Sequence, residues 1–142
     1  MKKTIILSFI LATFAGWASA QSPVGQWKTI DDETGKEKSI VEIFEKDGKL
    51  FGKVMKLIDP EEENPKCDEC EEDDDRYNQP VIGMEIIRDL EQDGEEWEDG
   101  TVMDPENGKI YSCKIWLEDE KTLKLRGYIA FFYRTQTWYR VE

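Results

Sequence analysis

The feature that most constrains this chain is a series of short stretches in which apolar and polar residues alternate. In residues 111–117, and again in 123–129, every second residue is apolar, aromatic or glycine. This period of two is typical of β-strands with one buried face. The stretches are separated by dipeptides that accept the backbone of tight hairpins: Asp47-Gly48, Asp93-Gly94 and Asn107-Gly108.

These patterns predict an all-β protein, an up-and-down antiparallel barrel of about eight strands. We expect strands at 24–30, 38–46, 49–58, 80–90, 95–104, 109–118, 121–129 and 135–141. Closure into a barrel removes the exposed strand edges of an open sheet. An eight-stranded barrel holds either a packed interior or one small ligand.

Residues 1–20 have the pattern of a secretory signal peptide. A positively charged start, Met1-Lys2-Lys3, precedes an apolar run, and Ala18-Ser19-Ala20 fits a signal-peptidase site. The apolar run falls short of the roughly 20 residues of a membrane-spanning helix, although an uncleaved anchor is the alternative reading. We therefore expect one exported domain, residues 21–142, in the periplasm or outside the cell.

Composition narrows the range of partners and chemistries. Loss of Lys2 and Lys3 with the signal peptide would leave 17 basic and 32 acidic residues, a net charge of −15. Such a charge repels nucleic acids and anionic membranes. The chain has no histidine, which removes the commonest general base and metal ligand. We predict no cofactor, metal site, nucleic-acid partner or membrane span after signal cleavage, and the sequence leaves the oligomeric state open.

The long segment 59–79 is strongly acidic and carries Cys67-Asp68-Glu69-Cys70. In an exported protein this spacing favours a local disulfide between Cys67 and Cys70. Its acidic neighbours disfavour a redox-active dithiol, and a zinc site would need a second ligand pair. Cys113 is expected to be a buried free thiol. The acidic residues could bind Ca²⁺ or could simply be solvated, and the EF-hand spacing is absent.

Two motifs at the ends of the domain resemble the lipocalin-like (calycin) barrels: Gly25-Gln26-Trp27 and Trp138-Tyr139-Arg140. The resemblance implies that Arg140 lies over Trp27 and closes one end of the barrel. The order of motifs in the whole domain resembles bacterial domain-of-unknown-function family 2147. The matching pieces are 25–27, 51–54, 63–65, 80–84, 97–100, 104–111, 125–128 and 136–140. This resemblance implies an eight-stranded barrel outside the cytoplasm and no particular activity. Residues 131–133, Phe-Phe-Tyr, depart from the family pattern.

Three functions fit these observations. The first is non-enzymatic binding of a small, partly apolar ligand in the periplasm, with Trp97, Tyr111, Arg126 and Tyr128 at the mouth of a barrel cavity. The second is a non-catalytic structural or interaction module of the envelope with a filled barrel. The third is a histidine-free hydrolase that uses paired carboxylates. The ligand site requires Arg126 and Tyr128 to point inward, and a register shift of one residue would exchange the faces of their strand.

Overall fold

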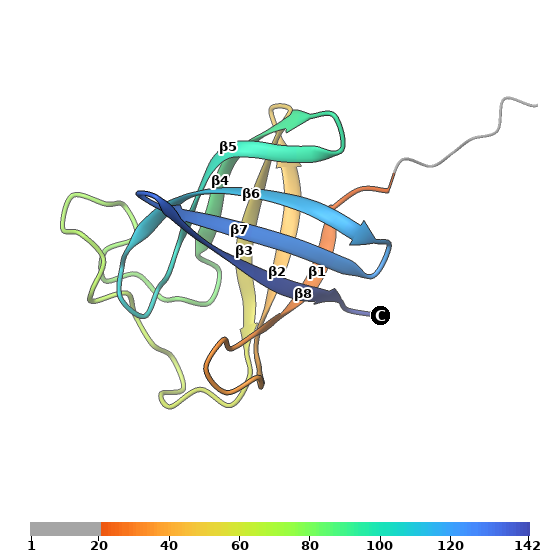
Figure 1. Cartoon of the computed structure of the whole chain (residues 1–142). Coiled ribbons are helices and arrows are strands. Elements are labelled where there is room, and N and C mark those ends of the chain that lie inside the picture. Colours follow the sequence, from red (N-terminus) through yellow and green to blue (C-terminus); the bar gives the residue numbers. More distant parts are fainter. Residues whose placement is uncertain (1–20) are drawn as a thin grey trace, which may run out of the picture.

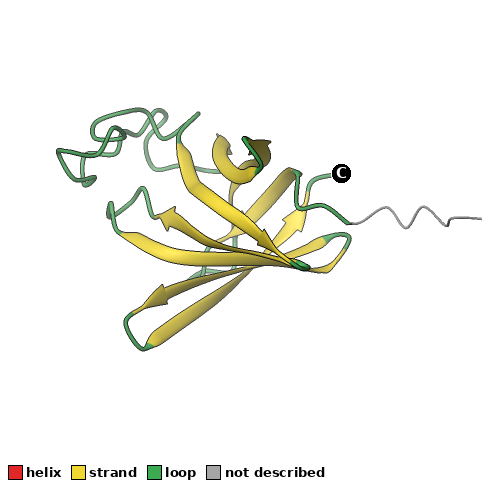
Figure 2. Ribbon diagram, turned by 90° about the horizontal axis from the view of Figure 1, so that it is seen from above, coloured by secondary structure: helices red, strands yellow, loops and turns green. Residues whose placement is uncertain are grey.

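The computed structural model describes residues 21–142, so the predicted signal peptide lies outside the described residues. The described chain contains eight strands and no helix: β1 (Gly25–Ile30), β2 (Glu37–Lys46), β3 (Lys49–Leu57), β4 (Glu85–Asp93), β5 (Glu96–Met103), β6 (Ile110–Asp119), β7 (Thr122–Ile129) and β8 (Phe132–Arg140). Each strand pairs antiparallel with the next, and β8 pairs with β1 to close the barrel (Figures 1 and 2). The predicted all-β barrel of eight strands is therefore confirmed.

The eight strands agree with the predicted ranges to within one residue, except in β4 and β8. β4 begins at Glu85 rather than at residue 80, because Gly83 has a φ of 90° and residues 81–84 form a turn, and it ends at Asp93 rather than at residue 90. β8 begins at Phe132 rather than at residue 135. The turn before it is Ala130-Phe131, which lacks the glycine or asparagine that marks most two-residue hairpin turns.

The barrel interior is filled by the alternating side chains that the sequence pattern predicts. The fully buried large residues are Trp27, Val41, Ile43, Leu50, Val54, Ile87, Leu90, Met103, Ile115 and Leu123, together with Cys67 and Cys113. Trp138, Leu125 and Trp97 belong to the same cluster. Burial of so many apolar side chains supplies the main driving force for folding.

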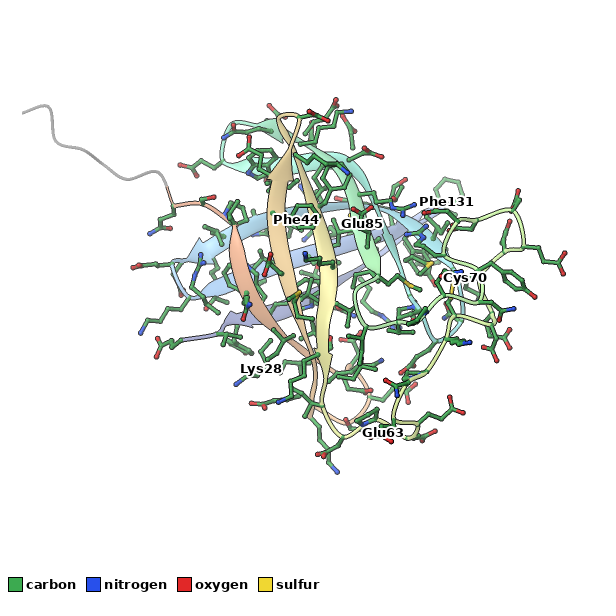
Figure 3. All side chains as sticks on the ribbon, turned by 180° about the vertical axis from the view of Figure 1, so that it is seen from behind. Lys28, Phe44, Glu63, Cys70, Glu85 and Phe131 are labelled. Carbon is green, nitrogen blue, oxygen red and sulfur yellow. A yellow bond between two sulfur atoms is a disulfide. The ribbon has the colours of Figure 1, made fainter. Side chains whose placement is uncertain are left out.

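The acidic segment between β3 and β4 packs against one end of this core. Its Cys67, Cys70 and Val81 side chains belong to the buried cluster. Gly108, in the turn between β5 and β6, has a φ of 72°, and a β-carbon there would collide with the backbone of Glu69. The segment is therefore anchored to the barrel, although most of its carboxylates remain exposed (Figure 3).

Candidate functional site

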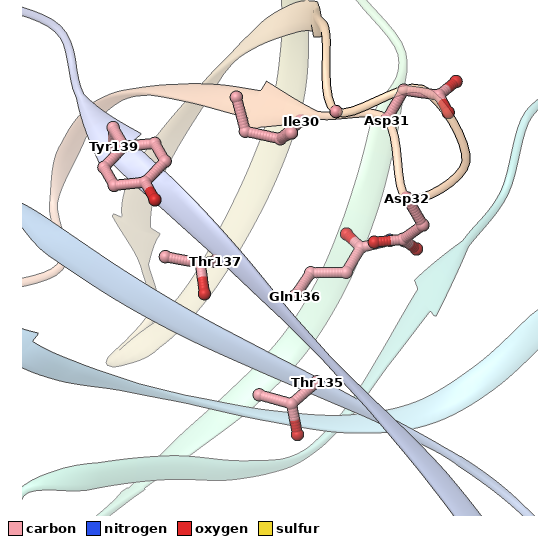
Figure 4. Close-up of a pocket in the computed structure, with 8 residues that line it drawn as sticks. Ile30, Asp31, Asp32, Thr135, Gln136, Thr137 and Tyr139 are labelled. Atoms are coloured by element: carbon pink, nitrogen blue, oxygen red, sulfur yellow. The ribbon is translucent and has the colours of Figure 1, made fainter.

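The barrel closes through a short contact between β1 and β8. The two strands pair at two positions, Trp27 with Arg140 and Lys28 with Tyr139. Beyond Ile30 the chain turns away from β8 into the connection to β2, while β8 continues back to Phe132. The barrel wall therefore has a seam along which most of β8 has no β1 partner (Figure 4).

An open pocket of about 380 Å³ lies in this seam, and we call it the seam pocket. Its volume lies near the lower end of the range of small-molecule sites. The lining combines apolar and hydrogen-bonding groups: Ile30, Asp31, Asp32, Gly35, Thr135, Gln136, Thr137 and Tyr139 (Figure 4).

Asp31 is held in its ionised form by the turn that follows β1. Its carboxylate accepts hydrogen bonds from the backbone N–H groups of Glu33 and Thr34, at 2.8 and 3.0 Å. These bonds, with a smaller contribution from Lys38, lower the pKa of Asp31. A carboxyl group with a lowered pKa is a poor general acid, because it has already lost its proton at neutral pH. Its negative charge can instead attract a cation.

Asp32 links the two sides of the seam. Its Oδ2 accepts a hydrogen bond of 2.8 Å from the Gln136 amide and lies 3.8 Å from the Arg134 guanidinium. The Arg134 side chain is 76% exposed, so this ion pair is loosely held and adds little binding energy. The Asp32 carboxylate thus faces the pocket with part of its hydrogen-bonding capacity free for a ligand.

The edge of β8 supplies backbone groups to the same pocket. The N–H of Arg140 donates to Lys121 on the β7 side, whereas the N–H of Val141 donates to Gln26 on the β1 side. Backbone groups alternate in direction along a strand, so those of Thr135 and Thr137 are directed toward the seam. Because β1 does not pair with either residue, these groups remain free to bind a ligand.

A second depression, of about 440 Å³, lies on the outer wall formed by β5, β6 and β7. It is lined by Glu98, Asp99, Gly100, Thr101, Ser112, Cys113, Lys114 and Tyr128. The pKa of Glu98 is raised, chiefly by a hydrogen bond shared with Asp93. Both carboxylates lie in or beside an exposed hairpin, which lacks the apolar enclosure typical of a catalytic acid.

The four residues predicted to line a barrel cavity lie in different places. Trp97 is buried in the core, and Tyr111 lies half-buried on the same side of the sheet. Arg126 and Tyr128 lie on the outer face of β7, because Leu123 and Leu125 occupy the interior. The predicted interior site is therefore wrong for Arg126 and Tyr128, and the face of β7 is the reverse of the one that it required. Tyr128 instead borders the second depression.

The predicted closure pair lies at the end of the barrel opposite the acidic segment. The Arg140 guanidinium is 4.3 Å from the centre of the Trp27 ring. The indole Nε1 of Trp27 donates a 2.8 Å hydrogen bond to the carbonyl of Pro23. The two motifs at residues 25–27 and 138–140 thus hold the first and last strands together.

The cysteines are arranged as the sequence predicted, with Cys67 bonded to Cys70 and Cys113 free and buried. Within residues 21–142, no group of three or more His, Cys, Asp or Glu side chains is arranged to hold a metal ion. No helix among these residues is long and apolar enough to cross a membrane.

Burial raises the pKa of the Cys113 thiol to about 12. We therefore expect no reaction of the folded protein with a thiol reagent at neutral pH, since the thiolate is the reactive form. After denaturation without reductant, one thiol per chain should react, and after reduction three should. Mass spectrometry of the alkylated protein measures both numbers. Three reactive thiols without reductant would contradict the disulfide.

The sequence offered no sign of the seam pocket. Asp31 and Asp32 are two of many acidic residues, and Gln136 is separated from them by more than one hundred residues.

Comparisons with known proteins agree with this architecture. The model of a family described as "Uncharacterized protein conserved in bacteria (DUF2147)" matches residues 25–140. A similar solved structure is that of protein HP1028 from the human pathogen Helicobacter pylori, which is described as belonging to the lipocalin family. It shares 20% identity, covers 85% of this chain and 84% of its own, and has a TM-score of 0.74. This likeness shows a shared fold. No curated protein matches the chain.

Proposed function

Because the chain belongs to the bacterial family DUF2147 and folds as a lipocalin-like barrel with a pocket in its wall, we propose that it is a non-catalytic binding protein. It works outside the cytoplasm and takes a small, partly apolar, positively charged ligand in the seam pocket. The observation that carries this proposal is the Asp32 carboxylate beside Ile30, Tyr139 and the free edge of β8.

The filled interior supports a site in the wall of the barrel. Trp27, Leu50, Leu90 and Ile115 occupy the space in which a lipocalin-type cavity would lie, and each is fully buried. The seam pocket, by contrast, is open to solvent and combines two carboxylates with hydroxyl, amide and aromatic groups. Small-molecule sites use a few such polar groups to orient a ligand against apolar surface.

Export is supported by two independent features. Residues 1–20 have the charge, length and cleavage pattern of a signal peptide. The Cys67–Cys70 disulfide is suited to an oxidising compartment. A periplasmic binding protein would meet small cations in solution, and the net negative charge of the domain would raise their local concentration.

The seam pocket is tested with a panel of small aliphatic and aromatic amines and with the uncharged alcohols of the same shape. We expect the amines to bind more tightly than the alcohols in isothermal titration calorimetry. Asp32→Asn should weaken amine binding by about tenfold or more, since a charge-assisted hydrogen bond contributes about 1.5–3 kcal/mol.

Asp99→Asn, in the second depression, is the matched control and should leave amine affinity unchanged. Equal affinity for amines and alcohols would contradict the assignment of a cationic ligand. Equal losses in the two variants would indicate a general effect of protein charge and would contradict the site.

A second candidate is an interaction module that binds an extended peptide along β8. It is favoured by the free backbone groups of Thr135 and Thr137, which could add a further strand to the sheet. Peptide binding would slow hydrogen exchange at the amides of these two residues and would tolerate Asp32→Asn. Amine binding, by contrast, would be weakened by Asp32→Asn.

A further inference from the structure

The hairpin between β7 and β8 ends in an apolar tip. Phe131 is 99% exposed, Phe132 76% and Tyr133 63%, and Ile129 beside them is 55% exposed. We call Ile129–Tyr133 the aromatic tip. The other two-residue hairpin turns, at 47–48, 94–95 and 120–121, consist of charged residues and glycine.

The turn itself is also unusual. Ala130 has a φ of 50°, a left-handed conformation that glycine or asparagine adopts more readily. In water, neither this alanine nor the fully exposed phenylalanine that follows it stabilises the hairpin. Contiguous exposed apolar surface of this kind marks a site of contact with another molecule or with a membrane.

An unpaired positive charge lies just behind the tip. The Arg126 guanidinium stacks 4.3 Å from the Tyr133 ring and 5.0 Å from the Trp116 ring on the outer face. Its Nε donates to the hydroxyl of Thr135 at 3.0 Å. Within residues 21–142 it has no carboxylate at ion-pair distance, in a chain with 32 acidic residues. Arg126 therefore retains N–H donors for an external anion such as a phosphate.

The spacing of these groups fits the depth of a membrane interface. Arg126 precedes Ile129 by three residues, which is about 10 Å along a strand. Interfacial elements bury their apolar side about 5–10 Å into the boundary between headgroups and acyl chains. With the phenylalanines at that depth, the guanidinium lies at the level of the lipid phosphates, where aromatic and arginine side chains are favoured.

We propose that the aromatic tip inserts into the surface of a zwitterionic phospholipid bilayer, with Arg126 bound to lipid phosphate. The formal net charge of −13 for the whole chain makes a neutral bilayer a better partner than an anionic one. It also opposes self-association, and a symmetric contact between two tips would bring the two Arg126 side chains together. This contact is separate from the seam pocket, so it does not depend on the proposed ligand.

The test is co-sedimentation of the exported protein with phosphatidylcholine vesicles at physiological salt. We expect the wild-type protein to sediment with the vesicles, and Phe131→Ser and Phe132→Ser each to weaken binding by about tenfold, the effect of one ring returned to water. Arg126→Gln should weaken binding while leaving the apolar tip intact. Addition of phosphatidylglycerol should weaken wild-type binding.

Ile82→Ser provides a matched control, because Ile82 is 42% exposed and lies outside the tip. This variant should bind vesicles like the wild type, and unchanged unfolding midpoints would show that all the variants fold. Absence of wild-type co-sedimentation, or equal binding by the tip and control variants, would overturn the proposal. So would a dimer in sedimentation velocity that the Phe131→Ser variant loses, since the tip would then bind a second copy.

Discussion

Arg140→Ala is expected to lower the free energy of unfolding by about 3 kcal/mol, because this side chain holds the ends of the domain together. The guanidinium donates hydrogen bonds to the carbonyls of Glu120, Val24 and Ser22, at 2.8, 3.1 and 3.0 Å. It also lies against Trp27. Alanine would remove all of these contacts and would leave the indole with one face uncovered.

Urea unfolding followed by tryptophan fluorescence measures this effect. Arg134→Ala is the matched control on the same strand, and it should change stability by less than about 0.5 kcal/mol because its ion pair is exposed. The free energy of unfolding of Arg140→Lys should fall between those of the wild type and Arg140→Ala, since an ammonium group cannot reproduce the forked donors of the guanidinium. Equal stability of the two alanine variants would refute the role of Arg140 in closure.

Asp74→Ala should also destabilise the protein by about 3 kcal/mol, because it would leave the Arg76 guanidinium buried without its counter-ion. The Arg76 side chain is 7% exposed and that of Asp74 12%. Arg76 donates to both carboxylate oxygens of Asp74, at 2.9 and 2.8 Å, and to the carbonyl of Glu85 at 3.0 Å. These contacts hold the acidic segment against the start of β4.

The adjacent residue provides the control for this variant. Asp75 pairs with Arg88, but its side chain is 71% exposed, so Asp75→Ala should change stability by about 0.5 kcal/mol. Thermal or urea unfolding distinguishes the two variants. Similar losses of stability for Asp74→Ala and Asp75→Ala would show that the burial of the Asp74–Arg76 pair adds nothing to the stability of the protein.

The same pair predicts a dependence of stability on pH. Hydrogen bonds from Arg76 hold the pKa of Asp74 far below its usual range. Its stabilising contribution is therefore complete above the unfolded pKa of about 3.9 and is lost as the pH falls from there toward the lower folded value. Acidification below about pH 4 should destabilise the wild type more than Asp74→Ala. Parallel pH profiles would contradict this assignment.

The alternation of side chains and the turn dipeptides determined most of the fold without tertiary information. Both are local signals, because strand period and hairpin geometry depend on neighbouring residues. Trp27 and Arg140 were also identifiable, through the resemblance of their motifs to those of the lipocalin-like barrels, and the pairing of the first and last strands brings the two residues together. The Cys67–Cys70 pair was predictable for the same local reason, its short spacing.

Only the tertiary structure decided which side of β7 faces inward. A period of two marks two faces equally well, and Arg126 and Tyr128 fit an inward face until Leu123 and Leu125 are seen to occupy it. Arg76 shows the same limit, because it follows a run of acidic residues that predicts exposure, whereas its burial depends on the packing of the acidic segment against β4. The seam pocket arises because β1 turns away at Ile30 while β8 continues, a relation between strands more than one hundred residues apart. Local sequence patterns determine which residues form strands, whereas the contacts that close the barrel determine which side chains are buried and which remain available for binding.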